Sequence, residues 1–173
     1  MEKIFLMFSL FLSTIAFSQV TPLTINNYSS YKLTGRLRAA DLTNCVPELY
    51  VGNTLSSGNF TIPASSSTEY VKYYTANTAT IPVFDYLVRM SNTTPASVLP
   101  YNHPNVVAIS PTTDWSFYAF DLRDAANNIY DHFELGVVPC ASNYPTYEMG
   151  SVSEAEWFTI TSGGTVHSYI QIY

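Results

Sequence analysis

The sequence predicts an all-β fold, a single antiparallel β-sandwich with at most one or two short helical turns. Apolar and polar residues alternate with a period of two through most of the chain, as in half-buried strands. No long segment repeats apolar residues at the helical spacing of about 3.6 residues. Gly, Asn, Pro and Ser separate the alternating segments at short intervals, which is typical of a sandwich of the immunoglobulin-like or jelly-roll-like type.

The N-terminal segment, residues 1–18, has the features of a signal peptide. A short charged start is followed by the apolar stretch 4–17, and small residues flank the expected cleavage after Ser18. The alternative is a membrane anchor, but the stretch is shorter than the ~20 residues that span a bilayer. We therefore expect a secreted or periplasmic protein whose mature chain, residues 19–173, forms one β-sandwich domain without a membrane span.

The charge of the chain limits its partners. The net charge is −6, and charged residues make up only 12% of the sequence. Nucleic acids and anionic membrane surfaces are bound through basic patches, which a chain with so few lysines and arginines does not supply. The composition therefore disfavours both partners.

Two cysteines, Cys45 and Cys140, complete the expectation of an exported protein. An even number of cysteines in an oxidising compartment favours a disulfide bond. The alternatives are two buried thiols or a metal site, and the metal site is disfavoured because neither cysteine has a second cysteine or histidine at ligand spacing.

The first clear strand lies at 31–40, where Leu33 and Leu37 alternate with basic and polar residues. The segment 153–158 has a possible capping box at Ser153 and Glu156, but its aromatic residues favour a strand. The same alternation predicts further strands at 59–63, 67–75, 82–90, 104–110, 113–122, 128–138, 155–160 and 164–173.

The segment 119–135 carries aspartates and asparagines between two apolar runs. Aspartate and asparagine satisfy their own backbone groups in turns, so the segment 123–128 is predicted to be a hairpin turn. A calcium site is the less favoured interpretation, because the spacing lacks the alternate-residue ligands and the glycine of an EF-hand loop. Its ligands would be Asp121, Asp124, Asn127 and Asp131.

No catalytic motif is evident. The three histidines occur singly, and none belongs to a zinc signature. His132 and Glu134 lie two residues apart and share a strand face, where they would serve as two ligands or as an acid–base pair. Outward polar residues on a half-buried strand are the commoner cause of this pattern. The sequence therefore favours a non-catalytic protein over a hydrolase with an unrecognised carboxylate pair.

Aromatic residues are the most unusual feature, with 14 tyrosines, 10 phenylalanines and 2 tryptophans. In 113–122 the alternation places Trp115 and Phe117 on one face and Tyr118 and Phe120 on the other. Tyr70, Lys72 and Tyr74 are predicted to share a polar face of the strand at 67–75. His167, Tyr169, Gln171 and Tyr173 form the corresponding strip of the last strand.

These outward aromatics predict a binding or surface-interaction module for an extracellular glycan or protein, because tyrosine combines a flat apolar face with a hydroxyl group. The simpler alternative is that cross-strand aromatic pairs only stabilise the sheet. A second function is an assembly subunit that self-associates through exposed strand edges, of which 164–173 would be one. The candidate ligand-binding residues are Tyr70, Lys72, Tyr74, Trp115, Tyr118 and Tyr169.

Overall fold

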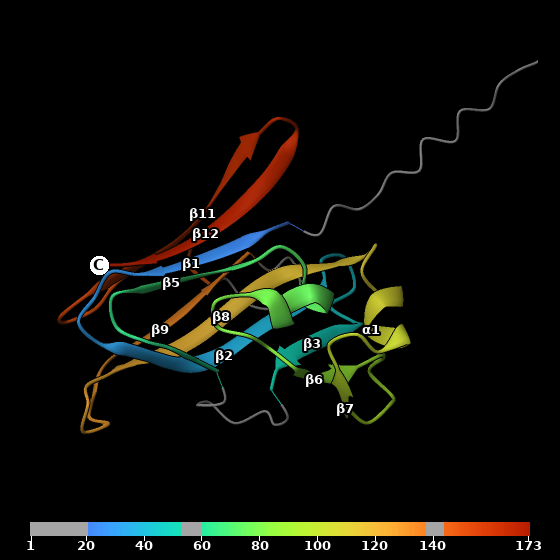
Figure 1. Ribbon diagram of the computed structural model, residues 1–173, viewed down its shortest axis with the longest axis horizontal. Helices are drawn as coiled ribbons and strands as arrows, with labels where there is room; N and C mark the ends of the chain where they lie inside the picture. The colour runs from blue at the N-terminus through green and yellow to red at the C-terminus, as the bar shows by residue number, and fades with distance from the viewer. Residues whose placement is uncertain (1–20, 53–59, 138–143) are drawn as a thin grey trace, which may run out of the picture.

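The computed structural model describes residues 21–52, 60–137 and 144–173 and shows two packed β-sheets without a long helix (Figure 1). The predicted all-β sandwich is therefore confirmed. The predicted signal peptide and Cys140 lie outside the described residues. Among the residues described, none of the helices has the length and apolar character needed to cross a membrane.

One sheet has five strands in the order β10-β11-β12-β1-β5. The first and last strands of the described chain, β1 and β12, are parallel neighbours, and the other pairs in this sheet are antiparallel. The sandwich thus departs from a purely antiparallel one at a single pair of this sheet. The strands are β1 (Leu23–Asn27), β5 (Ser66–Tyr70), β10 (Tyr147–Met149), β11 (Glu154–Ser162) and β12 (Thr165–Ile172).

The other sheet has seven antiparallel strands in the order β7-β6-β3-β2-β8-β9, with β4 paired to β2 beyond β3. Its long central pair, β2 and β8, runs the width of the molecule in Figure 1. The strands are β2 (Lys32–Asp41), β3 (Glu48–Val51), β4 (Phe60–Ile62), β6 (Asp85–Arg89), β7 (Ser97–Pro100), β8 (Thr113–Arg123) and β9 (Ile129–Gly136).

The core between the sheets takes up many of the aromatic residues. Tyr70, Tyr73, Tyr86 and Tyr118 are fully buried together with Trp115. The Tyr70 hydroxyl donates to the Ile81 carbonyl at 2.8 Å, and the Tyr86 hydroxyl donates to the Tyr73 carbonyl at 2.7 Å. Burial raises the pKa of all four tyrosines, so that their hydroxyl groups stay neutral in the core.

Two of the predicted strands are wrong in part or in full. The segment 104–110 forms a short helix, α1 (Pro104–Ala108), because proline suits a first helical turn and the His103 ring accepts the Asn105 N–H at 3.2 Å. The strand predicted at 67–75 ends at Tyr70, and a 3₁₀ helix, η1 (Tyr73–Thr78), follows it. Tyr70, Lys72 and Tyr74 therefore do not share a strand face.

A β-bulge in β8 changes the predicted alternation of aromatics. Arg38 pairs with Phe117 and Ala39 pairs with Trp115, which leaves Ser116 as the additional residue. Because the bulge inserts one residue, Trp115 comes to the same side as Tyr118. The prediction that Trp115 shares a face with Phe117 is wrong, since Trp115 joins the core and Phe117 packs against the Tyr144 ring with centroids 4.3 Å apart.

The last strand is not an edge. β12 lies between β11 and β1 and pairs with both, which corrects the prediction that 164–173 presents an exposed strand edge. The segment 153–158 contributes to strand β11, as its aromatic residues predicted. Four short strands, β1, β3, β7 and β10, were not predicted from the sequence.

Candidate functional site

The outer face of the five-stranded sheet presents two rows of side chains in register across the strands. One row contains Phe158, Tyr169, Thr24 and Glu69 on β11, β12, β1 and β5. A neighbouring row of polar side chains runs parallel to it and contains Tyr147, Glu156, Gln171, Asn26 and Ser67. These nine residues, together with Glu154, Tyr173 and Tyr28 beside them, are called the aromatic face below.

Stacked rings are the main apolar feature of this face. Phe158 and Tyr169 stack across β11 and β12, with ring centroids 5.4 Å apart and an interplanar angle of 16°. Tyr28, which follows β1, stacks on Tyr173 at 5.7 Å. Tyr28 is 58% exposed and Tyr173 is 47% exposed, so the second pair stands open to solvent.

Carboxylate and amide groups fix the tyrosine hydroxyls of the face. Tyr147 donates to Glu154 at 2.7 Å, and Tyr173 donates to Glu156 at 3.0 Å and also contacts Gln171. The hydrogen bond to Glu154, then partial burial, raises the pKa of Tyr147. The tyrosines thus remain neutral donors, and each carboxylate keeps acceptor positions for a further hydrogen bond.

A hollow of about 240 Å³ opens at the end of the face, next to Tyr28. Asn27 fixes its wall, because its side-chain amide donates to the carbonyls of Tyr31 at 2.7 Å and Pro63 at 2.8 Å. The remaining lining comes from Ser65, Ser66 and Ser67. The hollow therefore offers small hydroxyl groups beside an exposed ring.

Of the six candidate ligand-binding residues, the structure places Tyr169 on the aromatic face and does not bring the six together. Tyr70, Trp115 and Tyr118 are core residues, so their predicted outward placement is wrong. Lys72 and Tyr74 lie after β5, where the Lys72 ammonium group is 5.3 Å from the Tyr74 ring centroid.

Other residues of the face were missed from the sequence. The alternation of Glu154, Glu156 and Phe158 with the buried Ala155 and Trp157 is a usable signal, because it places the first three outward. Tyr28 gives no such signal, since it lies in a connection and meets Tyr173 only through the β1–β12 pairing.

The four proposed calcium ligands do not converge. Asp121 and Asp131 lie on opposite faces of the β8–β9 hairpin, because Asp121 pairs with His132 and Asp131 pairs with the core residue Leu122. Asp131 instead accepts the backbone N–H groups of Ser151 and Val152. Within 21–52, 60–137 and 144–173, no three His, Cys, Asp or Glu side chains are grouped to hold a metal ion.

The predicted hairpin turn occurs where the calcium loop was considered. Asp124 and Asn128 close it through a backbone hydrogen bond of 3.2 Å, and the Asp124 carboxylate accepts the Asn128 N–H at 2.9 Å. Asn127 adopts the left-handed conformation with φ of 67°. Local turn chemistry therefore accounts for these residues.

His132 and Glu134 border a hollow of about 260 Å³ on the outer face of the seven-stranded sheet. The hollow exists because the small Ala119 lies between larger neighbours on β2 and β9. His132 Nδ1 is 2.8 Å from Asp121, whereas His132 Nε2 is 3.8 Å from Glu134. Burial of Asp121 is outweighed by its hydrogen bonds to His132 and Arg123, which lower its pKa and hold it as a charged structural partner.

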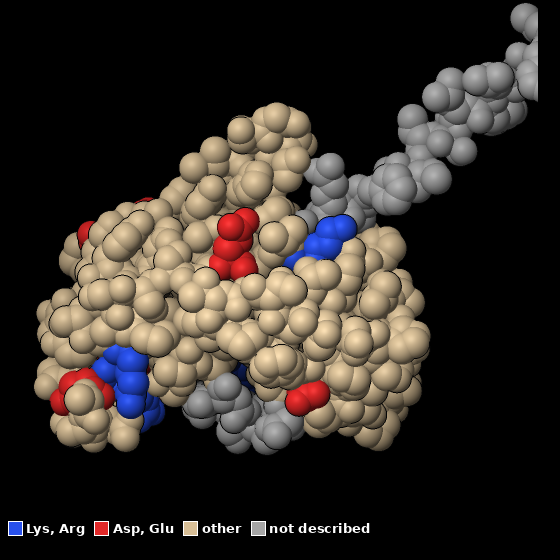
Figure 2. Space-filling view, viewed as in Figure 1, with Lys and Arg blue, Asp and Glu red and all other residues tan. Residues whose placement is uncertain are grey.

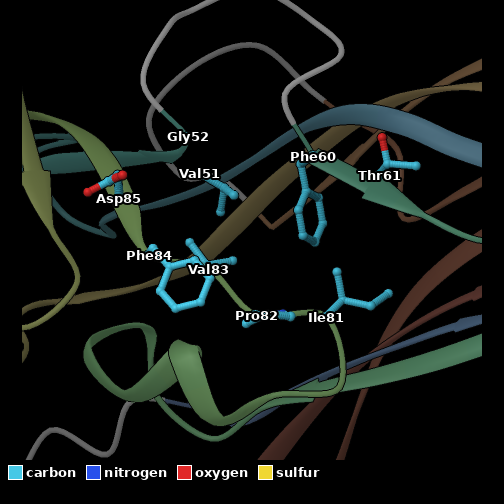
Figure 3. A pocket seen from close by; sticks show the side chains of 9 residues that line it. All are labelled: Val51, Gly52, Phe60, Thr61, Ile81, Pro82, Val83, Phe84 and Asp85. Atoms are coloured by element: carbon cyan, nitrogen blue, oxygen red, sulfur yellow. The ribbon is translucent and has the colours of Figure 1, made fainter.

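A slot of about 300 Å³ lies between β6 and β4 (Figure 3). Figure 3 shows Phe60 on one side of the slot and Val83 and Phe84 on the other. Asp85 is the only ionisable side chain among the residues that line it. The slot borders Gly52 and Phe60, between which the chain lies outside the described residues, so its full boundary is not defined.

Searches against models of protein families, curated proteins and solved structures found no match for this chain. The functional argument therefore rests on the geometry of the aromatic face.

Proposed function

We propose that this protein is an exported, non-catalytic module that binds a glycan on the aromatic face. The observation that carries the proposal is the pair of ring stacks, Phe158–Tyr169 and Tyr28–Tyr173, beside oriented carboxylate and amide groups. The stacks lie on the same face of one sheet, so a single extended ligand would contact both.

The chemistry of a sugar ring suits this arrangement. A pyranose has an apolar C–H face that packs on an aromatic ring, and hydroxyl groups at its rim that need hydrogen-bond partners. Glu156, Gln171 and Asn26 present acceptor and donor groups in one row across the strands. Tyr169 and Tyr173 lie four residues apart on the same strand, a separation of roughly 13 Å, which is longer than one sugar ring.

Export and a Cys45–Cys140 disulfide bond belong to the same proposal. Cys45 lies in the turn after β2, where its N–H donates to the Asp41 carbonyl at 2.9 Å. Expression of the full chain in an exporting host is expected to give a protein that begins at Gln19. Its intact mass should rise by two hydrogens on reduction, and an unchanged mass would rule out the bridge.

Alanine variants of the ring stacks test the binding site on the mature domain, residues 19–173. A glycan array first identifies a ligand, and calorimetry then measures its affinity. Tyr169→Ala is expected to weaken binding roughly tenfold, and the double variant Tyr28→Ala/Tyr169→Ala roughly a hundredfold, since each lost ring contact is worth about 1.5 kcal/mol.

Tyr130→Ala is the matched control. Tyr130 is also an exposed tyrosine in a ring contact, 4.8 Å from Tyr31, but it belongs to β9 of the other sheet. Its replacement should leave glycan affinity unchanged. A domain that retains no glycan, or equal losses in the Tyr130 and Tyr169 variants, would refute the proposed site and direct attention to protein partners.

A further inference from the structure

The two sheets differ in their charged residues. The five strands of the five-stranded sheet contain no lysine or arginine. The seven-stranded sheet carries five basic residues, namely Lys32, Arg36, Arg38, Arg89 and Arg123. Lys72, which follows β5, is the remaining basic residue of the described chain. The aromatic face is thus acidic, with no basic side chain among its own residues.

Three glutamates give the face its charge. Glu154 and Glu156 lie on β11 and already hold tyrosine hydroxyls, while Glu69 is exposed on β5. A carboxylate can accept about four hydrogen bonds, so one tyrosine leaves room for a ligand donor. Figure 2 shows how sparse charged side chains are over the face of the molecule that it presents, which leaves few neighbouring charges to offset a local group of carboxylates.

We propose, on the basis of the proposed function, that the preferred glycan is a polymer of amino sugars whose amines are free and protonated. Such a chain offers the apolar ring faces that the stacked aromatics accept. Its ammonium groups complement the glutamates and interact favourably with aromatic ring faces. Glycans that carry carboxylate or sulfate groups are repelled by the same face.

The size of the preference follows from exposed ion pairs. Each exposed pair changes an equilibrium by only a few-fold, and salt screens it. With two or three glutamates in reach of successive sugar units, we expect a preference of roughly tenfold for the free-amine chain at low salt. High salt should remove most of this preference and leave the contribution of ring stacking.

Two oligosaccharides of equal length separate charge from shape. The probes are the β-1,4-linked hexamer of glucosamine and its fully N-acetylated counterpart, with binding to the mature domain measured by calorimetry at mildly acidic pH. The free-amine hexamer is expected to bind roughly tenfold more tightly at low salt. The double variant Glu154→Gln/Glu156→Gln should reduce this ratio to about two- or threefold without weakening the N-acetylated hexamer.

Glutamine retains a carbonyl acceptor for the Tyr147 and Tyr173 hydroxyls, so this double variant removes charge while keeping the hydrogen bonds of the face. Glu134→Gln, on the opposite sheet, is the control and should leave the ratio unchanged. If the N-acetylated hexamer binds equally well or better, and Tyr169→Ala weakens it, the amino-sugar preference is overturned while glycan binding stands.

Two other outcomes separate the remaining explanations. Binding of neither hexamer, together with a blank glycan array, would overturn glycan binding itself. Oligolysine of matched charge is the third probe, and it is expected to bind more weakly than the free-amine hexamer. Equal affinity for oligolysine would show that charge alone selects the ligand, which would overturn the sugar preference in favour of a basic peptide.

Discussion

Replacement of Glu48 with alanine is expected to lower the free energy of unfolding by about 3–5 kcal/mol. Glu48 is only 2% exposed, and its carboxylate binds Arg38 at 2.7 Å, Arg89 at 2.5 Å and the Tyr50 hydroxyl at 3.0 Å. Arg38 is also buried, so removal of the carboxylate would leave a buried guanidinium group without these contacts. The loss follows from this uncompensated charge rather than from the strength of the ion pairs themselves.

Urea unfolding followed by tryptophan fluorescence measures this effect. Glu134→Ala is the control, because Glu134 lies two strands away from Glu48 and is largely exposed, and its cost should stay within about 0.5 kcal/mol. Arg89 is more exposed than Arg38, so Arg89→Ala should cost less than Glu48→Ala. A Glu48 variant as stable as the Glu134 variant would show that the buried charge network does not stabilise the seven-stranded sheet.

Gly35→Ala is expected to cost about 3 kcal/mol or more, or to prevent folding. Gly35 lies in the middle of β2, directly opposite Phe120 of β8. A methyl group at this position would lie 2.1 Å from the Ala119 carbonyl oxygen and 2.6 Å from the Phe120 Cβ. Both neighbours belong to the backbone or to its first side-chain atom, so the central strand pair would have to separate.

Gly163→Ala provides the contrast. Gly163 is in the turn between β11 and β12 with φ of 59°, and a Cβ atom there meets nothing within 4 Å. Its substitution should cost only the left-handed backbone penalty of about 1–2 kcal/mol. Thermal unfolding of both variants distinguishes the two causes, and similar costs would contradict the steric argument for Gly35.

Local patterns in the sequence predict the strands and the hairpin because the information for them is local. The alternation of Leu33 and Leu37 with polar residues places both in the core, as found. The Asp124–Asn128 turn follows from side chains that bond their own backbone. These features depend on neighbours two to four residues apart.

Features that depend on distant pairing were not predictable. The bulge at Ser116 is visible only through the register of β8 against β2, and it moves Trp115 from the expected outer face into the core. The position of β12 inside its sheet depends on β1, which lies more than a hundred residues earlier in the chain. A strand pattern gives alternation but not the identity of the neighbouring strands.

The candidate site divides in the same way. Tyr169 was predicted because it alternates with buried residues within one strand. Tyr28 and Tyr147 reach the aromatic face through strand order, and Tyr28 comes from a connection rather than from a strand. The buried Tyr70 and Tyr118 were predicted to be exposed because an aromatic residue alone does not indicate which side of a sheet is covered.

The parallel pairing of β1 with β12 also determines how the domain would bear a mechanical load. Residue 21 and residue 173, the first and last of the described chain, lie at opposite ends of this strand pair, as Figure 1 shows. A force that pulls these ends apart acts along the strands and loads the Leu23–Asn27 pairing with β12 in shear. Hydrogen bonds loaded in shear break together rather than one after another, so a domain tethered at one end and bound to a polymer at its face resists extension along its length.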